Sequence, residues 1–312
     1  MERTKVNKTP TAILTSDWHL RETIPICRTD NYWKAQWKKV DYISMLQKKY
    51  NCPVIHAGDL YDKWKITTYL SKVTMQHLPN QFHTIYGQHD LPSHSIQLSE
   101  KCGIDLLQEA GKLTVLNHKN PLISGKSIIY GLQWSQLFPT KLEDDAPLIC
   151  LEDNDKIVLV WHHLTYQQKP FPGASGGMAA GLLRKYPQFD LIVTGDNHQA
   201  FTEEHEGRLL VNPGSLMRMD ADQIDFKPRV YLWYADTNTV TPVYLPIEEG
   251  VVSRDHIDRV EQRNNRIDAF ISKLDGDWKA GTSFEQNLEE FKKKNQVRDK
   301  IMDIIYKAIE NE

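Results

Sequence analysis

The sequence predicts an α/β protein: a two-sheet β-sandwich flanked by helices, followed by a C-terminal helical extension. Three observations carry this prediction. Short apolar runs alternate with longer helical patterns over the first 135 residues, the pattern after Lys126 is mostly strands, and strand signals end near Ser253 while charge rises. Strands separated by helices indicate β-α-β units, and the later strands supply a second sheet.

Four strands and two helices are predicted in the first half. Between the first two strands, apolar residues recur at three- and four-residue steps from Trp33 to Tyr50, which is typical of an amphipathic helix. A second, shorter stripe runs from Ile66 to Val73. The predicted strands are Thr11–Thr15, Pro53–His56, Phe82–Tyr86 and Leu113–Leu116.

The second half is predicted to contain mostly strands. Its segment Phe171–Gly181 holds four glycines, which favours a flexible surface loop, with a substrate-facing lid as the alternative. The predicted strands are Ser127–Tyr130, Ile157–Trp161, Leu191–Thr194, Leu209–Val211, Val230–Tyr234 and Val240–Leu245.

The region after Ser253 is predicted to be a separate helical arm, so we expect one domain over residues 1–250 and the arm over residues 251–312. The arm is expected to contain a helix over Asp255–Leu274, a loop over Asp275–Thr282 and one long final helix over Ser283–Glu310. The final helix is amphipathic. Its apolar stripe either folds back on the first domain or docks on another chain.

Composition excludes some classes of protein. The chain has 312 residues, 40% of them hydrophobic and 25% charged, which is typical of a soluble globular protein. No apolar run is long enough to span a bilayer, and Met1–Pro10 lacks the apolar core of a secretory signal. We therefore expect a cytoplasmic protein without membrane association.

Charge and cysteine content add two expectations. The net charge of −3 supplies no whole-chain positive field, which argues against a free-standing DNA binder but not against a nuclease whose partner supplies much of the grip. The four cysteines lie far apart without a C-x-x-C pair, so we expect reduced, partly buried thiols. They are Cys27, Cys52, Cys102 and Cys150.

Five short segments share one design, in which an apolar strand ends and ligand-type residues follow at once. Loops beyond the carboxyl ends of strands in an α/β sheet converge on one crevice, so we expect these residues to meet. Carboxylates with imidazoles suit manganese, iron, zinc or magnesium-like ions, and a pair of such ions suits phosphoryl transfer. The segments are Ile13–His19, Val54–Asp62, Ile85–Asp90, Val158–His163 and Leu191–His198.

The order of these motifs, D-x-H, G-D-x-x-D, G-x-H-D, H and G-x-x-H, resembles the calcineurin-like metallophosphoesterases. Ser16–Leu20, Gly58–Asp62 and Asn212–Leu216 also resemble SbcD-type nucleases of double-strand-break repair, including their phage relatives. The similarity covers roughly Thr11 to Leu245. It implies the metallophosphoesterase fold, with residues 1–250 as a nuclease domain and residues 251–312 as a partner-binding or capping arm.

The resemblance implies a dinuclear centre in which Asp59 bridges both ions. The remaining implied ligands are Asp17, His19 and His198 for the first ion, and Gln88, His162 and Asp196 for the second. His162 is preferred over His163, because strand alternation places it on the ligand side. His56, just before the loop that carries Asp59, is expected to be a core or supporting histidine.

The resemblance also assigns catalytic roles. His89 matches the general acid or transition-state stabiliser of the family, and Asp90 is expected to orient its ring. Asp62 would steady the loop. Several aromatic and basic residues lie near these loops: Trp18, Lys63, Trp64, Lys65 and His94. They either contact DNA, or the tryptophans pack beneath the site and the lysines are solvent-exposed.

Two positions depart from the family pattern. Gln88 stands where the family has asparagine, and Asp196 stands where it has the first histidine of G-H-x-H. Both changes fall on the second ion. A carboxylate in place of an imidazole makes the site harder, so we expect two divalent ions, with manganese favoured, magnesium as the alternative, and zinc disfavoured.

The leading hypothesis is a metal-dependent DNA nuclease, an SbcD-like exonuclease or endonuclease subunit acting in DNA repair, recombination or phage DNA processing. The resemblance implies DNA as substrate, an SbcC-like SMC-type ATPase docked through the C-terminal helices, and a homodimer. Two alternatives stay open. One is a phosphodiesterase or phosphatase for nucleotides or phosphoproteins, and the other is a non-catalytic scaffold.

Overall fold

The computed structural model describes residues 9–137, 155–277 and 284–310. The chain divides into two compact units, Met1–Ser253 and Arg254–Glu312. The first is an α/β unit with two mixed sheets flanked by helices, as the sequence predicts. The roles of residues 1–250 as a nuclease domain and of residues 251–312 as a partner-binding or capping arm remain predictions.

The first sheet has the strand order β14-β13-β1-β2-β3-β4. Strands β1 to β4 run parallel, and β13 and β14 join the edge of β1 antiparallel to their neighbours. Chain from the C-terminal half therefore completes a sheet begun by the N-terminal half. The bounds are Ala12–Thr15 for β1, Val54–His56 for β2, Phe82–Thr84 for β3, Thr114–Val115 for β4, Arg229–Tyr234 for β13 and Thr239–Tyr244 for β14.

The second sheet has the order β11-β12-β10-β7-β6-β5. Its four central strands run parallel, and the edge strands β5 and β11 are antiparallel to their neighbours. The bounds are Leu122–Ser124 for β5, Ser127–Leu132 for β6, Lys156–Trp161 for β7, Leu191–Thr194 for β10, Phe201–His205 for β11 and Arg208–Asn212 for β12.

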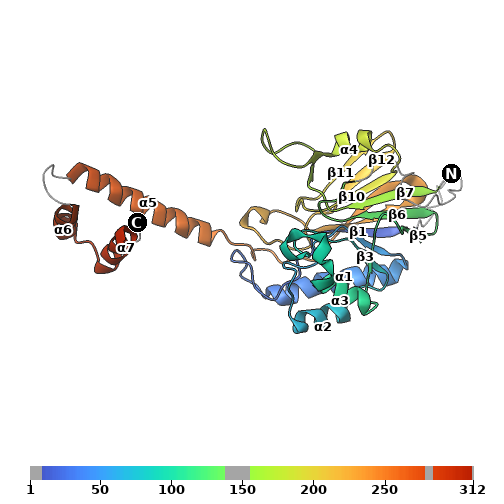
Figure 1. The fold of residues 1–312 in the computed structure, drawn as a ribbon, viewed down its shortest axis with the longest axis horizontal. Coiled ribbons are helices and arrows are strands. Elements are labelled where there is room, and N and C mark those ends of the chain that lie inside the picture. The colour runs from blue at the N-terminus through green and yellow to red at the C-terminus, as the bar shows by residue number, and fades with distance from the viewer. Residues whose placement is uncertain (1–8, 138–154, 278–283, 311–312) are drawn as a thin grey trace. The chain divides into compact units, whose positions relative to one another are not determined.

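Helices cover the outer faces of both sheets. The first sheet is covered by α1, α2 and α3, and the second by α4 (Figure 1). Asparagines cap both ends of α1, as is common in helices. At the N-terminal end Asn31 accepts a hydrogen bond from the Lys34 amide, and at the C-terminal end Asn51 takes a left-handed conformation. The bounds are Tyr32–Tyr50 for α1, Thr68–His77 for α2, Gly103–Glu109 for α3 and Ala179–Lys185 for α4.

Strand alternation divides the core into three layers. On β1, Ile13 joins the cluster beneath α1, whereas Leu14 joins the cluster between the two sheets. On β7, Leu159 packs beneath α4, whereas Val160 faces the other sheet. Both faces of the central strands are buried, so these strands are largely apolar, and their few polar residues, such as His56 and Thr84, are buried as well.

Several short elements were absent from the sequence prediction. The segment predicted as a loop over Phe171–Gly181 contains β9 (Gly177–Met178), which pairs with β8 (Thr165–Tyr166), and the first turn of α4. Strand β11 was missed because its sequence is largely polar. It forms a hairpin with β12 through Glu206 and Gly207, both at positive φ, as a two-residue hairpin turn requires.

The second unit consists of three helices. They are α5 (Asp255–Asp277), α6 (Phe284–Asn295) and α7 (Asp299–Glu310). The predicted loop start at Asp275 is therefore wrong, since α5 continues to Asp277, and the rest of that loop lies outside the described residues. Within the described chain, no helix is both long and apolar enough to cross a membrane.

The single final helix predicted over Ser283–Glu310 is also wrong, because α6 ends before α7 begins. Gln296 takes a left-handed conformation with φ 52°, and the Val297 amide bonds the Lys292 carbonyl 3.2 Å away. This six-residue closure is a Schellman ending. The break falls just after the run of lysines at 292–294.

A buried lysine connects α1 to the first strand-end loop. Lys39 is 3% exposed and donates to the Leu216 carbonyl at 2.9 Å, while the Leu216 amide donates to the Asp17 carbonyl at 3.0 Å. Burial, aided by Arg28 and Arg218, lowers the pKa of Lys39 to about 7. The Lys39 amine is thus buried, with its charged form disfavoured, where its hydrogen bond holds one loop in place.

We expect Lys39 to add about 2 kcal/mol to the free energy of unfolding between pH 7 and pH 9, so that stability over this range changes more favourably in the parent protein than in Lys39→Met by that amount. Over that range the unfolded lysine keeps its proton and the folded one loses it, so higher pH favours the folded state. Urea denaturation of both proteins at both pH values measures the difference. Equal pH dependence in the two proteins would contradict a buried, largely neutral Lys39.

Candidate metal centre

The five predicted segments converge on one place. Asp17 and His19 follow β1, and Asp59 follows β2. Gln88 and His89 lie beyond β3, His162 follows β7 directly, and Asp196 and His198 follow β10. Since the strands of each sheet carrying these loops run parallel, their carboxyl ends meet at one edge of the sandwich.

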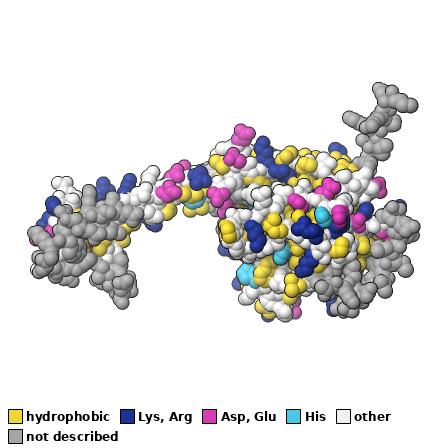
Figure 2. All heavy atoms as spheres, turned by 90° about the horizontal axis from the view of Figure 1, so that it is seen from above, with side chains coloured by type: hydrophobic (Ala, Val, Ile, Leu, Met, Phe, Trp, Pro, Cys, Tyr) yellow, Lys and Arg dark blue, Asp and Glu magenta, His cyan; other side chains and the backbone are white. Residues whose placement is uncertain are grey.

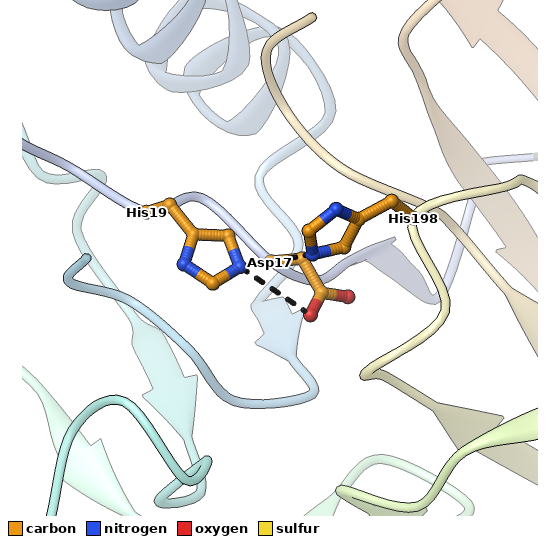
Figure 3. A group of neighbouring side chains, drawn as sticks. All are labelled: Asp17, His19 and His198. Atoms are coloured by element: carbon orange, nitrogen blue, oxygen red, sulfur yellow. Dashed lines mark hydrogen bonds and ion pairs between the residues drawn. The ribbon is translucent and has the colours of Figure 1, made fainter. Parts of the chain in front are cut away.

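Three of these side chains form the first half of the centre. The Nε2 atoms of His19 and His198 lie 3.1 Å apart, and Nε2 of His19 lies 3.9 Å from Oδ1 of Asp17. Figure 3 shows the two rings and the carboxylate turned toward one another. Their ligand atoms are close enough to share one ion.

Asp59 stands between this group and the second half. Its Oδ2 lies 3.7 Å from Nε2 of His19 and 3.4 Å from Nε2 of His162. It belongs to two further groups that could hold an ion, one with His19 and His89 and the other with Asp17 and His162. A carboxylate shared between neighbouring groups is the arrangement that a bridging ligand needs.

The His162 ring is oriented by the backbone. Its Nδ1 bonds the Ala57 carbonyl at 2.6 Å, which leaves Nε2 directed at Asp59. A hydrogen bond of this kind fixes the tautomer and the ring plane of a metal-binding histidine. His163 instead stacks on Trp161, with ring centroids 4.1 Å apart and planes within 8°. The geometry therefore supports the choice of His162.

Buried atoms without partners show that the centre fits cations. Among the described residues, four candidate ligands each carry a buried polar atom with no hydrogen-bond partner. A buried polar atom that lacks a partner is costly, and bound divalent ions would supply partners for atoms of this kind. The atoms are Oδ2 of Asp17, Oδ2 of Asp59, Oε1 of Gln88 and Nε2 of His162.

The electrostatics of the centre also favour positive charge. Burial raises the pKa of the Asp17 carboxyl to about 6. Burial opposes charge on Asp59 and His162 as well, but their mutual attraction lowers the pKa of Asp59 and raises that of His162 to about 10. Burial lowers the pKa of His19 well below its usual value, which keeps this ring neutral and able to coordinate.

Glycines allow the loops to approach one another. A Cβ on Gly87 would lie 2.1 Å from Oδ1 of Asp59, and a Cβ on Gly195 would lie 2.7 Å from Nδ1 of His162. Neither clash could be relieved without moving a candidate ligand. The side chain at both positions is therefore excluded by the metal centre itself.

The expectation that Asp90 orients the His89 ring is wrong. The Asp90 carboxylate accepts from the backbone amides of Asp59, Leu60, Tyr61 and Gly87 at 2.9–3.3 Å. It is fully buried, and burial raises its pKa to about 7. Asp90 therefore positions the loop that carries Asp59, and both of its oxygens are occupied in doing so.

The His89 ring is held by Asp62 instead. Its Nδ1 bonds the Asp62 carbonyl at 3.1 Å, and the Asp62 carboxylate pairs with Arg21 at 2.9 Å. The ring packs edge-on against His19, with centroids 4.9 Å apart. The backbone amide of His89 donates to Oδ1 of Asp59 at 2.9 Å. Asp62 thus steadies the site through its main chain, which no side-chain pattern could reveal.

The segment Asn212–Leu216 braces the centre from the second sheet. Oγ of Ser16 donates to the Gly214 carbonyl at 3.2 Å, and the Ser215 amide donates to the His198 carbonyl at 3.2 Å. With the Leu216 bond to Asp17, these contacts hold the first and last ligand loops together. The sequence singled this motif out only by resemblance.

The two residues that depart from the family pattern contact each other. Nε2 of Gln88 donates to Oδ1 of Asp196 at 2.6 Å, and the Asp196 amide donates to Oδ1 of Asp17 at 3.0 Å. Among the described residues, Asp196 joins none of the carboxylate and imidazole groups close enough to share an ion. Its role as a ligand therefore remains a prediction, and its contact makes Gln88 and Asp196 a coupled pair.

We expect Gln88→Asn and Asp196→His together to shift the relative affinity for manganese and zinc toward zinc by about tenfold or more. An imidazole in place of a carboxylate softens the site. Competition titration against a chelating dye measures both affinities. His163→Gln, at a histidine stacked outside the centre, is the matched control. An unchanged metal profile in the double variant would mean that neither residue faces an ion.

The aromatic and basic side chains flagged near the site divide into two groups. Trp18 is fully buried against His56 and Phe82, so it packs beneath the site. Lys63, Trp64, Lys65 and His94 are exposed. Cys27, Cys52 and Cys102 are free and buried, as predicted, while Cys150 lies outside the described residues.

Two curated proteins are similar in sequence, and both are named DNA double-strand break repair protein Mre11. The Haloferax volcanii protein is 27% identical over 235 residues, which cover 69% of this chain and 49% of the relative. The Halobacterium salinarum protein is 27% identical over 184 residues, which cover 57% and 44%. The chain thus spans about half the length of the curated relatives it matches.

Solved structures are more distant. A Thermus thermophilus protein, TT1561, has a TM-score of 0.45 at 11% identity, covering 76% of this chain and 99% of that one. An archaeal phosphodiesterase has a TM-score of 0.40 at 13% identity, covering 75% and 99%.

A family model matches most of the first unit. The model of the calcineurin-like phosphoesterase superfamily domain matches residues 12–227, which include every candidate ligand of the metal centre. It covers more than two thirds of the chain and confirms the resemblance drawn from the motifs. The chain belongs to the calcineurin-like phosphoesterase superfamily.

Proposed function

We propose that this protein is a metal-dependent nuclease that hydrolyses phosphodiester bonds in DNA, as the nuclease subunit of a repair, recombination or phage DNA-processing complex. The observation that carries the hydrolytic part is the buried group around Asp59, whose unpartnered atoms suit divalent cations. The DNA substrate is supported by the similarity to two double-strand-break repair proteins.

The residues of the chain divide the chemistry between them. Manganese is the proposed ion, two per site, and when bound it would supply Lewis-acid activation of water and of the phosphoryl group. Asp59 and His162 would hold the ions at the centre of the site, since Oδ2 of Asp59 and Nε2 of His162 are buried without hydrogen-bond partners and lie 3.4 Å apart. His89, held on the Asp62 carbonyl, presents its ring at the edge of the group, where it donates to the reacting phosphate or its leaving oxygen.

Surface charge supports a nuclease that relies on a partner. On the face seen in Figure 2, basic, acidic and hydrophobic side chains are interspersed. The net charge is −3. A nuclease acting alone on DNA ordinarily shows a basic stripe. We therefore propose that another subunit makes part of the contacts with DNA.

The second unit is the proposed docking element for that subunit, an SMC-type ATPase resembling SbcC. Leu288 and Phe291 of α6 and Met302 of α7 are buried, whereas Ile301 and Ile304 expose 46% and 65% of their surface. Exposed isoleucines on an amphipathic helix suit a partner groove. A homodimer is the expected accompanying assembly.

We expect a chain truncated after Ser253 to stay folded and to hydrolyse a chromogenic phosphodiester at near-normal rate. It should fail to co-purify with its SbcC-like ATPase and lose ATP-stimulated duplex cleavage. The reason is that both sheets and every candidate ligand lie in the first unit. Ile301→Asp/Ile304→Asp in the full chain should lose the ATPase in the same way. Unfolding of the truncated chain would show that the arm belongs to the catalytic core instead.

The decisive experiment is incubation of the purified protein with end-labelled duplex and single-stranded DNA, with manganese and then with chelator. Cleavage that requires manganese and is lost in the matched Asp59→Asn protein supports the proposal. Hydrolysis of a nucleotide diester without cleavage of either DNA would instead favour a small-molecule phosphodiesterase. No hydrolysis of any ester would favour the scaffold alternative.

A further inference from the structure

Two aromatic side chains lie beside the metal centre without a role in it. They are His94, which is exposed, and Trp134, which is half-buried. Their ring centroids are 5.7 Å apart and their planes are tilted by 51°. Both are anchored to one stretch of backbone, since Nδ1 of His94 bonds the Gln88 carbonyl at 2.8 Å and the Trp134 amide bonds the Tyr86 carbonyl at 2.9 Å.

The His94 ring is held by the same kind of hydrogen bond, from Nδ1 to a backbone carbonyl, that orients the histidines of the site. His162 is held by the Ala57 carbonyl and His89 by the Asp62 carbonyl, in each case through Nδ1. His94 is held through the same atom by the carbonyl of Gln88, a candidate ligand. An exposed ring normally rotates freely, whereas this hydrogen bond holds the His94 ring against the backbone of a candidate ligand.

The backbone is strained to present these rings. Ser93 and His94 both take left-handed conformations, with φ of 50° and 54°, and Ser135, directly after Trp134, has φ 63°. Such conformations are unfavourable for residues other than glycine, and they gather at functional sites.

Other tryptophans near the site are accounted for. Trp18 and Trp161 are buried in the core. Trp64 lines a separate cavity of about 410 Å³ together with Ile66 and Leu106. Trp134 is bonded through its backbone amide to Tyr86, two residues before Gln88, and its half-buried ring contacts the ring of His94.

We propose that His94 and Trp134 form a stacking shelf that receives the nucleobase attached to the scissile phosphate. This inference rests on the proposed function and makes it narrower, since it requires a substrate that carries a base. A base stacked on fixed aromatic rings would be recognised by its π-face and not by its edge. The shelf therefore favours nucleotide diesters over base-free diesters without selecting one base.

The test compares two chromogenic diesters with manganese. Thymidine 5′-monophosphate p-nitrophenyl ester carries a base, and bis(p-nitrophenyl) phosphate does not. The measured quantity is the ratio of their kcat/KM values. In Trp134→Ala we expect this ratio to fall about tenfold, mainly through a higher KM for the nucleotide ester, and in Trp134→Phe to recover most of the loss.

His94 is tested by His94→Asn. Asparagine tolerates the left-handed backbone and can still donate to the Gln88 carbonyl, so this variant removes the ring while keeping its attachment. We expect the same fall in the ratio. The matched control is Tyr69→Ala, which removes an aromatic ring stacked on Trp33 on α1 and α2. It should leave the ratio unchanged.

The outcomes separate this inference from the proposed function. Ratios that stay at the parental value in Trp134→Ala and His94→Asn would overturn the shelf while leaving the hydrolase intact. A Trp134→Phe protein as impaired as Trp134→Ala would assign Trp134 a packing role and also overturn it. A parent protein that hydrolyses neither ester would overturn the proposed function, and the shelf with it.

Discussion

Replacing Asp59 by alanine should reduce phosphodiester hydrolysis to background and lower the bound metal. The carboxylate lies within 3.7 Å of His19 and 3.4 Å of His162, and it belongs to two of the three groups that could hold an ion. Its loss therefore weakens both halves of the site. The fall should exceed the roughly 10²–10⁴-fold expected for removal of a single proton donor.

Metal content measured by mass spectrometry and hydrolysis of a chromogenic diester check this result together. Asp59 also accepts a hydrogen bond from the His89 amide. Asp59→Asn keeps an oxygen for this bond but loses the carboxylate, so it should be almost as inactive as Asp59→Ala. Asp41→Ala removes an exposed carboxylate paired with His77 and is the matched control. Near-normal manganese-dependent activity in folded Asp59→Ala would exclude a shared ligand at this position.

Strand ends were predictable because two simple patterns coincide there. An apolar run such as Leu191–Thr194 marks a buried strand, and the polar residues directly after it have no place in the core. Repeated five times, this pattern located Asp17, Asp59 and His198 without any knowledge of their contacts. The two-sheet arrangement was predicted from the order of the elements, since β-α-β patterns come first and mostly strands follow.

Contacts through the main chain and between distant segments could not be predicted. Asp90 follows His89 in sequence, yet its carboxylate turns to the amides of the loop after β2, a segment about 30 residues earlier. The pairing of Gln88 with Asp196 depends on the two sheets packing together, and no local pattern reports it. The end of α6 depends on one left-handed residue, Gln296, in a sequence that is otherwise helical.

Replacing His89 by alanine should lower the hydrolytic rate by about 10²–10⁴-fold while metal binding stays near normal. The backbone amide that bonds Asp59 is kept in the variant, so only the ring and its bond to the Asp62 carbonyl are lost. Rates and metal affinity are measured on the same preparation, with His163→Ala as the control for loss of a nearby imidazole outside the centre.

The choice of leaving group decides what the ring does. If His89 donates a proton to the departing oxygen, its loss should matter less for p-nitrophenolate, which leaves without a proton, than for an alkoxide of a DNA strand. If the ring instead stabilises charge on the phosphoryl group, both substrates should lose similar factors. A third outcome follows from geometry, because the His89 ring lies close enough to His19 and Asp59 to share an ion with them. Loss of metal together with activity would make His89 a ligand, and the proton donor would then have to be sought elsewhere.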